Sequence, residues 1–397
     1  YRKLVIEACM PEFRGDLDAR LERLFPDAPL MVEDLLYQLC VEVNPGLDIH
    51  EVRLTVDGGA APATRTAEDD ELEDAARDAL LARLRGVART LGASLEQDVL
   101  GQPRAISAVV RAVRAAAAGL GESRRPIASF LFPGRTGTGK TELARRMAAH
   151  LFADAGRNGL VRSDCSEFAR AHEYAKLIGS PPGYVGHDDG GQLTDAVAEQ
   201  PECVVLFDEV EKAHPKLHNL MLQILEEGAL TDGKGRRVSF ERTIVVMTSN
   251  CGAEEMTSAS RSAGCGTEPT LGRASLEVIT EDALARSFAP EFLGRIGEIV
   301  LFDELGPKTV ERVAQKKLDE LVARAERRGL SLRFTPAVAR WVAGRGFRPE
   351  TGARELRRVI QREIEPKLSD VLLAVEPGDE HGVVVRARRG ELYFDAA

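Results

Sequence analysis

The 397-residue sequence has few aromatic residues and no surplus of positive charge. Aromatic residues make up 5% of it, with a single tryptophan, and the formal net charge is −10 at pH 7. Proteins that bind nucleic acid over a broad surface normally carry a basic excess, so this class is disfavoured, although a local basic patch is still allowed. No apolar run approaches the roughly 20 residues that a membrane span needs, and no signal peptide is visible. We therefore expect a cytoplasmic protein with no membrane partner. The chain begins with Tyr1 and not with methionine, so the sequence leaves open whether residues precede it.

The cysteines and histidines give no sign of a metal site. None of the six cysteines forms a CxxC pair, and none lies with histidine at a zinc-binding spacing. In a chain of this size without a secretory signal, we expect most cysteines to be reduced, small buried residues. His214 and His218 are four residues apart, which is a metal-binding spacing, but the glutamate of an HExxH motif is absent between them. We expect both histidines to be solvated positions on a helix.

The N-terminal quarter of the chain predicts an accessory unit and a connection. Residues 1–59 mix strand-like and helix-like patterns, which predicts a small α+β unit. Residues 60–98 begin as a linker rich in glycine, alanine, proline and threonine and continue as a charged amphipathic helix. The unit in residues 1–59 does not resemble a domain that we recognise.

From residue 99 onward the pattern changes to alternating strands and helices. Apolar, strand-like runs lie at residues 127–132, 203–207 and 243–248, and segments with helical spacing lie between them. Strands that alternate with helices predict a parallel sheet covered on both faces, so residues 99–300 are expected to form an α/β domain. Residues 301–397 are expected to form a second, mostly helical domain that closes with a hairpin from GVVVRAR and ELYF.

A phosphate-binding loop is predicted at the start of the α/β domain. GRTGTGKT matches the Walker A pattern GxxxxGK[ST], follows a predicted strand and opens a predicted helix. Glycines let successive backbone N–H groups face phosphates, and the helix N-terminus adds the positive end of its dipole. Lys140 is expected to reach the β- and γ-phosphates of ATP, and the Thr141 hydroxyl to bind Mg²⁺. The residues predicted to contact the nucleotide in this loop are Gly134, Thr136, Gly137, Thr138, Gly139, Lys140 and Thr141.

The next buried run supplies the residues expected to hydrolyse ATP. VVLFDE is a Walker B pattern that places Asp208 at the carboxyl end of a strand, the edge at which open α/β sheets bind ligands. Asp208 is expected to hold Mg²⁺ through water, and Glu209 to polarise the attacking water. The third run ends in MTSN, which is expected to bring Asn250 beside the γ-phosphate, although an asparagine after a strand is by itself more often a turn residue. There is no NKxD motif, so a signalling GTPase is disfavoured.

Together these segments resemble the AAA+ ATPases, and among them the Clp unfoldase and disaggregase family, most closely the second ATPase ring of two-ring Clp proteins. The resemblance runs from about Val99 to Phe394 and implies an AAA+ large domain with a mostly helical lid. The matching segments, in family order, are VLGQPRAISAVV, SDCSEFARAHEYAKLIGSPPGYVGHDDGG, FDEVEKAHP, LTDGKGRRVSF, MTSN, APEFLGRIGEIV and ETGARELRRVIQREIEPKL. The first of them implies that Leu100 and Gly101 lie on the adenine side of the nucleotide.

The resemblance also assigns two arginines and the substrate loop. Arg295 stands at the arginine-finger position, which implies that it reaches a neighbour's nucleotide and that the chain forms a homo-oligomeric ring, with six subunits as the family number. Arg354 stands at the sensor-two position on the lid, where it would touch its own subunit's phosphates. The loop Gly183, Tyr184, Val185, Gly186 is similar to the pore loop that grips polypeptide in the central channel. Two aspartates follow this loop and would repel phosphate, so a peptide is favoured over a nucleobase as its substrate.

Several positions depart from the family pattern. Arg135 stands where proline is usual, which we expect to alter the contact between subunits, and Thr138 replaces a small apolar residue. After the MTSN strand there is no aliphatic–Gly–Phe/Leu tripeptide, so docking to a barrel peptidase is unsupported. The expected function is that of an ATP-dependent protein unfoldase or remodelling chaperone. The alternatives are an AAA+ ATPase that acts on nucleic acid and a nucleotide-controlled scaffold that binds a partner.

Overall fold

The structure is a computed structural model, and it describes residues 67–122, 124–152, 158–170, 173–179, 190–262, 272–348, 352–374 and 381–396. The chain divides by its contacts into two compact units, Tyr1–Ala61 and Pro62–Ala397. All described residues belong to the second unit. The α+β unit expected in residues 1–59 therefore lies outside the described residues. In the part of the chain that is described, no helix is long and apolar enough to cross a membrane.

A five-stranded parallel sheet forms the centre of the α/β part, with strand order β2-β3-β6-β1-β7. Its strands are β1 (Ala128–Phe132), β2 (Leu160–Asp164), β3 (Val204–Asp208), β6 (Ile244–Thr248) and β7 (Glu298–Ile299). The three central strands are those that the apolar runs predict, because a strand covered on both faces needs apolar side chains at every position. Every residue of β3 and β6 is buried. The two edge strands, β2 and β7, were not predicted: β2 reads LVRSD and is partly exposed, and β7 has only two residues.

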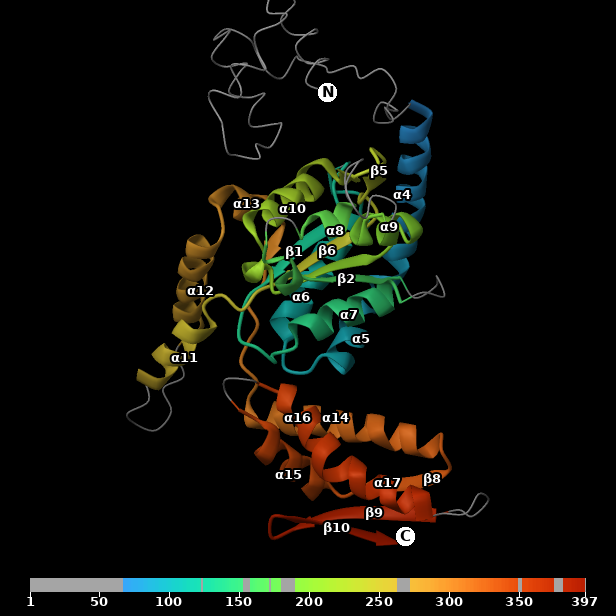
Figure 1. Cartoon of the computed structure of the whole chain (residues 1–397), viewed down its shortest axis with the longest axis vertical. Coiled ribbons are helices and arrows are strands. Elements are labelled where there is room, and N and C mark those ends of the chain that lie inside the picture. The colour runs from blue at the N-terminus through green and yellow to red at the C-terminus, as the bar shows by residue number, and fades with distance from the viewer. Residues whose placement is uncertain are drawn as a thin grey trace, which may run out of the picture. The chain divides into compact units, whose positions relative to one another are not determined.

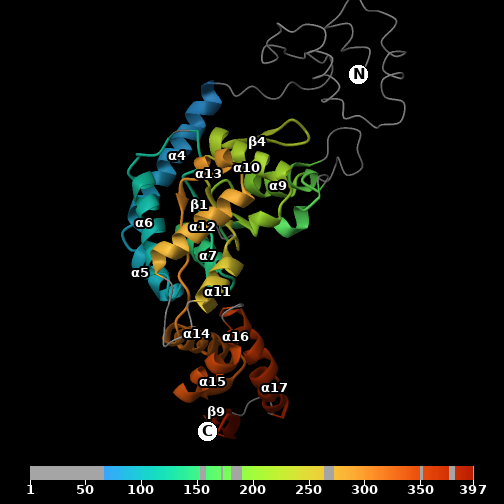
Figure 2. The ribbon, with the colours of Figure 1, turned by 90° about the vertical axis from the view of Figure 1, so that its left-hand side faces the viewer.

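Helices cover both faces of this sheet (Figures 1 and 2). One face carries α4 (Ala67–Val87), α5 (Leu91–Asp98), α6 (Pro103–Ala117) and α7 (Lys140–Leu151). The other carries α8 (Ala175–Ile178), α9 (Gln192–Glu199), α10 (Pro215–Glu227), α12 (Arg273–Ser287) and α13 (Pro290–Arg295). Successive side chains of β1 alternate between the faces: Phe130 and Phe132 belong to one hydrophobic cluster and Leu131 to the other. Helix α11 (Ala253–Ser262) and the hairpin β4 (Ala229–Thr231) and β5 (Arg237–Ser239) complete this part.

The lead-in segment contributes to this core and is more than a connection. Leu80 and Leu84 of α4, with Leu91 and Leu95 of α5, are buried in the same hydrophobic cluster as β1. Burial of these four leucines ties both helices to the sheet face that also packs α7, the helix that follows the glycine-rich segment 134–139.

The C-terminal part has a hydrophobic cluster of its own, built from Leu305 and later residues. Its elements are α14 (Pro307–Glu326), β8 (Leu330–Phe334), α15 (Pro336–Gly346), α16 (Arg354–Val359), a π-helical turn (Ile360–Ile364), α17 (Glu365–Ala374), β9 (His381–Arg388) and β10 (Glu391–Ala396). The expected hairpin is present as β9 and β10. The sequence did not predict β8, which pairs in parallel with β9 to make a three-stranded sheet. The predicted α/β architecture with a mostly helical C-terminal part is confirmed.

Candidate nucleotide site

The glycine-rich loop joins the carboxyl end of β1 to the N-terminus of α7. Gly137 and Gly139 adopt φ angles of 74° and 108°, in the left-handed region that glycine reaches without strain. The Lys140 ammonium folds back under the loop and donates hydrogen bonds to the carbonyls of Gly134 and Arg135, the latter at 3.0 Å. Burial lowers the pKa of Lys140 to about 8, although nearby carboxylates oppose the shift. The loop therefore holds a largely desolvated cation at the end of the sheet.

The loop borders a cavity of about 350 Å³, a size that suits a small ligand. The residues predicted to bind nucleotide that line this cavity are Leu100, Thr136, Gly137, Thr138, Gly139, Lys140, Thr141, Asp208, Glu209, Asn250 and Arg354. Gly101 and Gly134 are not among the lining residues. Gly101 lies against Leu305 and Thr309, and Gly134 lies against Phe302, so both support the wall from behind.

Polar and apolar side chains are sorted within the cavity. Val99, Leu100, Leu305 and Val313 give it an apolar side. Cations of the C-terminal part line it together with the glycine-rich loop: Lys316, Lys317, Arg354 and Arg357. The sequence did not predict Lys316, Lys317 or Arg357 as lining residues. Such a cavity suits a ligand with one flat apolar end and one anionic end.

Asp208 is held by partners on three strands or helices. Its Oδ1 accepts hydrogen bonds from the hydroxyls of Thr248, at 2.5 Å, and Thr141, at 3.2 Å. Its Oδ2 forms an ion pair with Arg162 of β2 at 2.7 Å. A carboxylate beside a hydroxyl is the oxygen donor set that Mg²⁺ prefers, so Thr141 and Asp208 fit this ion. No group of three or more His, Cys, Asp or Glu that could hold a metal is found among the described residues, so phosphate oxygens and water would have to complete the coordination.

Glu209 occupies a strained turn at the end of β3. Its φ and ψ are 60° and 52°, a left-handed conformation that costs a non-glycine residue about 1–3 kcal/mol. The turn is held because the Glu209 N–H donates to the Thr248 hydroxyl at 3.0 Å. The carboxylate accepts a hydrogen bond from the Asn250 side-chain amide at 3.3 Å and pairs with Lys212 at 2.5 Å. The hydrogen bond to Glu209 raises the pKa of Lys212.

Asn250 connects the two halves of the site. Strand β6, which precedes it, lies directly beside β3. The Asn250 side-chain oxygen accepts from Lys140 at 2.9 Å, while its amide nitrogen donates to Glu209 at 3.3 Å. Its backbone N–H donates to Glu211 at 3.1 Å. One side chain thus joins the buried cation of the loop to the carboxylate after β3.

Two family models match the chain. The AAA domain (Cdc48 subfamily) matches residues 125–299, and the C-terminal, D2-small domain of ClpB protein matches residues 305–385. The chain belongs to the Clp family of AAA+ ATPases. The C-terminal match is to the second ATPase module, as the resemblance implied.

Relatives of this Clp chain are known from curated proteins and solved structures. It is 43% identical to the probable chaperone protein ClpB 1 of Chlorobaculum tepidum, over 73% of this chain and 66% of the relative. It is 43% identical to the negative regulator of genetic competence ClpC/MecB of Bacillus subtilis, over 75% of this chain and 36% of the relative. A closed-state cryo-EM structure of Hsp104 with ATPγS and FITC casein matches with a TM-score of 0.67 and 37% identity, over 78% of this chain and 51% of that one. The chain spans about one to two thirds of the length of such curated relatives.

The two arginines expected from the Clp family lie in different places. Arg354, the first residue of α16, is exposed and lines the cavity. Arg295, the last residue of α13, is absent from the cavity lining and forms an ion pair with Glu226 of α10. The structure of this chain therefore brings Arg354, but not Arg295, to the site of Lys140 and Glu209.

The segment expected to be the pore loop, Gly183–Gly186, lies outside the described residues. Its flanks are described: α8 ends before Gly179 and α9 begins after Gly191. A β-carbon on Gly179 would lie 3.2 Å from the backbone of Gly190, so the two flanks touch.

The departures from the Clp pattern are accommodated inside the chain. Arg135 is only 7% exposed and forms an ion pair with Glu304 at 2.6 Å. The Thr138 hydroxyl donates to the Arg135 carbonyl at 2.9 Å. The Arg135 guanidinium is thus buried and paired within its own chain, and we expect any effect of this residue on a subunit contact to be indirect.

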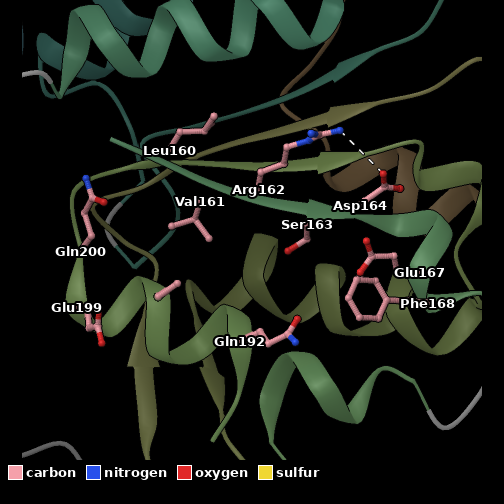
Figure 3. A pocket seen from close by; sticks show the side chains of 11 residues that line it. Leu160, Val161, Arg162, Ser163, Asp164, Glu167, Phe168, Gln192, Glu199 and Gln200 are labelled. Atoms are coloured by element: carbon pink, nitrogen blue, oxygen red, sulfur yellow. Dashed lines mark ion pairs between the residues drawn. The ribbon is translucent and has the colours of Figure 1, made fainter. Parts of the chain in front are cut away.

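Arg162, Thr248 and Glu211 contact the site but were not predicted from the sequence. Arg162 also lines a second cavity of about 530 Å³, which lies between the edge strand β2 and α9 (Figure 3). At one end of that cavity Arg162 pairs with Asp164 at 3.9 Å. No residue predicted to bind nucleotide or metal lines this cavity. Its connection with the site is Arg162, which bridges to Asp208.

Proposed function

We propose that the protein is an ATP-dependent, ring-forming ATPase that remodels proteins by drawing polypeptide through a central channel. The single observation that carries the proposal is the chain of contacts from Lys140 through Asn250 to Glu209, in the cavity that Thr141 and Asp208 also line. These contacts join the ammonium that would bind phosphate to the carboxylate that would act on water.

ATP would lie with its base on the apolar side and its phosphates at the loop. Leu100 and Leu305 offer apolar contact for adenine. The loop N–H groups, the start of α7 and the Lys140 ammonium would bind the phosphates. Arg354 would add a charge from the C-terminal part, so the position of that part would respond to the state of the nucleotide.

Hydrolysis would use the residues after β3 and β6. Thr141 and Asp208 would hold Mg²⁺, which when bound neutralises charge on the phosphates. Glu209 would orient and polarise a water, and the Asn250 amide fixes the direction of the Glu209 carboxylate. Lys212 competes for the same carboxylate, so release of this ion pair would free Glu209 to act.

Arg295 would complete the site of a neighbouring subunit. A cation supplied from outside a phosphate pocket can raise the hydrolysis rate by about 10³–10⁵. Because Arg295 is half-exposed and does not line its own cavity, a neighbour's cavity is the better destination. For every subunit to receive this cation the subunits would have to form a closed ring, for which six subunits is the family expectation. Arg295 would exchange its pairing with Glu226 for the neighbour's phosphate.

The substrate would be an extended polypeptide held by Tyr184. Its flanking glycines permit movement, and an aromatic ring can press against many peptide sequences. The similarity to Hsp104, solved with casein, supports this substrate class. The relatives named as chaperones do not favour the nucleic-acid alternative. Docking to a barrel peptidase stays unsupported by the sequence, and residues 263–271 of the relevant stretch lie outside the described residues.

A Glu209→Gln variant tests the catalytic assignment. It should bind ATP, assemble and retain a labelled unfolded protein, but hydrolyse ATP at less than about one hundredth of the normal rate, in the range expected for loss of a general base. Glu227→Gln is the matched control, because Glu227 is an exposed carboxylate at the end of α10. Normal turnover by the Glu209→Gln variant would refute the assignment.

A further inference from the structure

His218 has two sets of contacts that join separate parts of the α/β domain. It lies on α10, and its Nε2 is 3.0 Å from the Val210 carbonyl oxygen. Its ring packs against Phe288 and Phe292, with ring centroids at 5.2 and 5.3 Å. The expectation of a solvated histidine at this position is wrong, because the ring is half-buried between aromatic neighbours and a backbone carbonyl.

The first set of contacts reaches the catalytic turn. Val210 is buried and directly follows Glu209, whose left-handed backbone is the strained point of the site. A carbonyl only accepts hydrogen bonds, so His218 Nε2–H is the donor. This hydrogen bond holds the Val210 carbonyl, one residue beyond Glu209, and the Ala213 N–H donates to the same carbonyl at 3.2 Å. The Glu209 N–H is held separately, by the Thr248 hydroxyl.

The second set of contacts reaches the helix that ends in Arg295. Phe292 is 1% exposed and lies on α13, three residues before Arg295. Phe288 and Phe292 pack on each other at 5.5 Å, so His218 completes a cluster of three rings. Glu226, the ion-pair partner of Arg295, lies on α10 as well, two helical turns beyond His218. Helix α10 therefore holds α13 at two points.

We propose that His218 is a positioning residue that couples the turn of Glu209 to α13 and Arg295. The inference rests on the proposed function, in which Glu209 serves its own subunit and Arg295 serves the neighbour. A change in the Glu209 turn on nucleotide binding would then be transmitted through one rigid side chain to the arginine that acts in the next pocket. His218 is not among the residues that line the nucleotide cavity, so it would act through Glu209 and Arg295.

Mixed rings separate the two roles of His218. Rings of Glu209→Gln subunits, and rings of Arg295→Ala subunits, should each be inactive. A mixture should regain ATPase activity, because a Glu209→Gln subunit supplies Arg295 to an Arg295→Ala subunit that still has Glu209. His218→Phe, which keeps an aromatic ring but loses the donor, is then placed in one type of subunit at a time. In the Arg295→Ala subunit it reports on Glu209, and in the Glu209→Gln subunit it reports on the delivery of Arg295.

The inference predicts a lower kcat in both placements, by about fivefold for one lost hydrogen bond, with an unchanged KM for ATP. His218→Gln, which can donate but lacks the ring, should lower kcat in the same two placements. His214→Asn is the control: His214 caps the same helix through a hydrogen bond to the Lys216 N–H, which asparagine can replace, so kcat should stay normal. An unchanged melting temperature of His218→Phe shows that the loss is not unfolding.

The outcomes distinguish this inference from the proposed function. If the mixture with His218 intact gains no activity, Arg295 does not act in trans, and both the ring proposal and the coupling are overturned. If the mixture is active but His218→Phe lowers kcat in only one placement, or in neither, the ring proposal stands and the coupling alone is overturned.

Discussion

Nucleotide binding should take up a proton near pH 8, because of the buried ammonium of Lys140. Burial lowers the pKa of this group to about 8 from an ordinary value of 10.5. The phosphates of ATP would return the pKa toward or above its ordinary value, since an opposite charge stabilises the ammonium. Uptake should therefore be about 0.1 proton at pH 7, about 0.5 at pH 8 and about 0.9 at pH 9. Above pH 8 the affinity for ATP should fall by up to about tenfold for each pH unit.

Isothermal titration of a non-hydrolysable ATP analogue measures this uptake. The experiment is run at pH 7, 8 and 9 in pairs of buffers that differ in ionisation enthalpy, and the difference in heat gives the protons exchanged. Lys140→Arg is the control, because a guanidinium stays charged over this range and should abolish the uptake. A binding heat that does not depend on the buffer at pH 8 and 9 would refute the reasoning.

The same shift predicts how the nucleotide-free protein responds to pH. The folded pKa of Lys140 lies below its unfolded value, so the unfolded chain binds more protons between pH 8 and 10.5. Burial of the charged form costs about 3 kcal/mol below pH 8, and this cost disappears as the pH rises through that window. Lys140 thus makes a contribution to the free energy of unfolding that increases with pH above 8.

Three further changes test the packing around the site. Gly352→Ala should weaken ATP binding, measured by titration, about tenfold, which is the cost of roughly one displaced loop contact, because a β-carbon there would lie 2.6 Å from the Thr136 carbonyl oxygen. Gly344 has open space around it, so the control variant Gly344→Ala should bind ATP normally. Phe292→Ala should lower the free energy of unfolding in urea by about 3–5 kcal/mol, and a loss below 1 kcal/mol would contradict its packing. Asn250→Ala should lower kcat at least about tenfold at saturating ATP, since Glu209 loses its orienting amide; an unchanged kcat would show that this hydrogen bond does not matter.

The parts of the site predicted from sequence are those that lie on single segments. The loop motif identifies Lys140 and Thr141, and the end of one apolar run identifies Asp208 and Glu209. Each pair lies within one short segment, so it can be predicted without knowing which distant segments come together. Predicting the position of Asn250 required one further expectation, that its strand lies beside the strand that precedes Glu209. Strands β3 and β6 are neighbours in the sheet, as expected. Apolar runs predicted the central strands well because burial on both faces leaves an unbroken pattern.

The missed features depend on contacts between segments far apart in the chain. Edge strand β2 has one open side and therefore a mixed sequence, so neither the strand nor the contact of Arg162 with Asp208 could be read from the pattern. Lys316 and Arg357 line the cavity only because the C-terminal part packs beside the loop. His218 looked like a solvated helix position because its aromatic partners follow it by about 70 residues. The expectation of a cytoplasmic setting stays a prediction.

Unfolding of a tagged fluorescent protein, followed together with ATP consumption, tests the central claim most directly. The wild-type ring should destroy the fluorescence while it hydrolyses ATP. A Tyr184→Ala ring should hydrolyse ATP at a similar rate but leave the substrate folded, whereas Tyr393→Ala, which removes an exposed tyrosine of β10, should behave as wild type. Full-rate unfolding by the Tyr184→Ala ring, or hydrolysis by the wild type without any unfolding, would contradict the account.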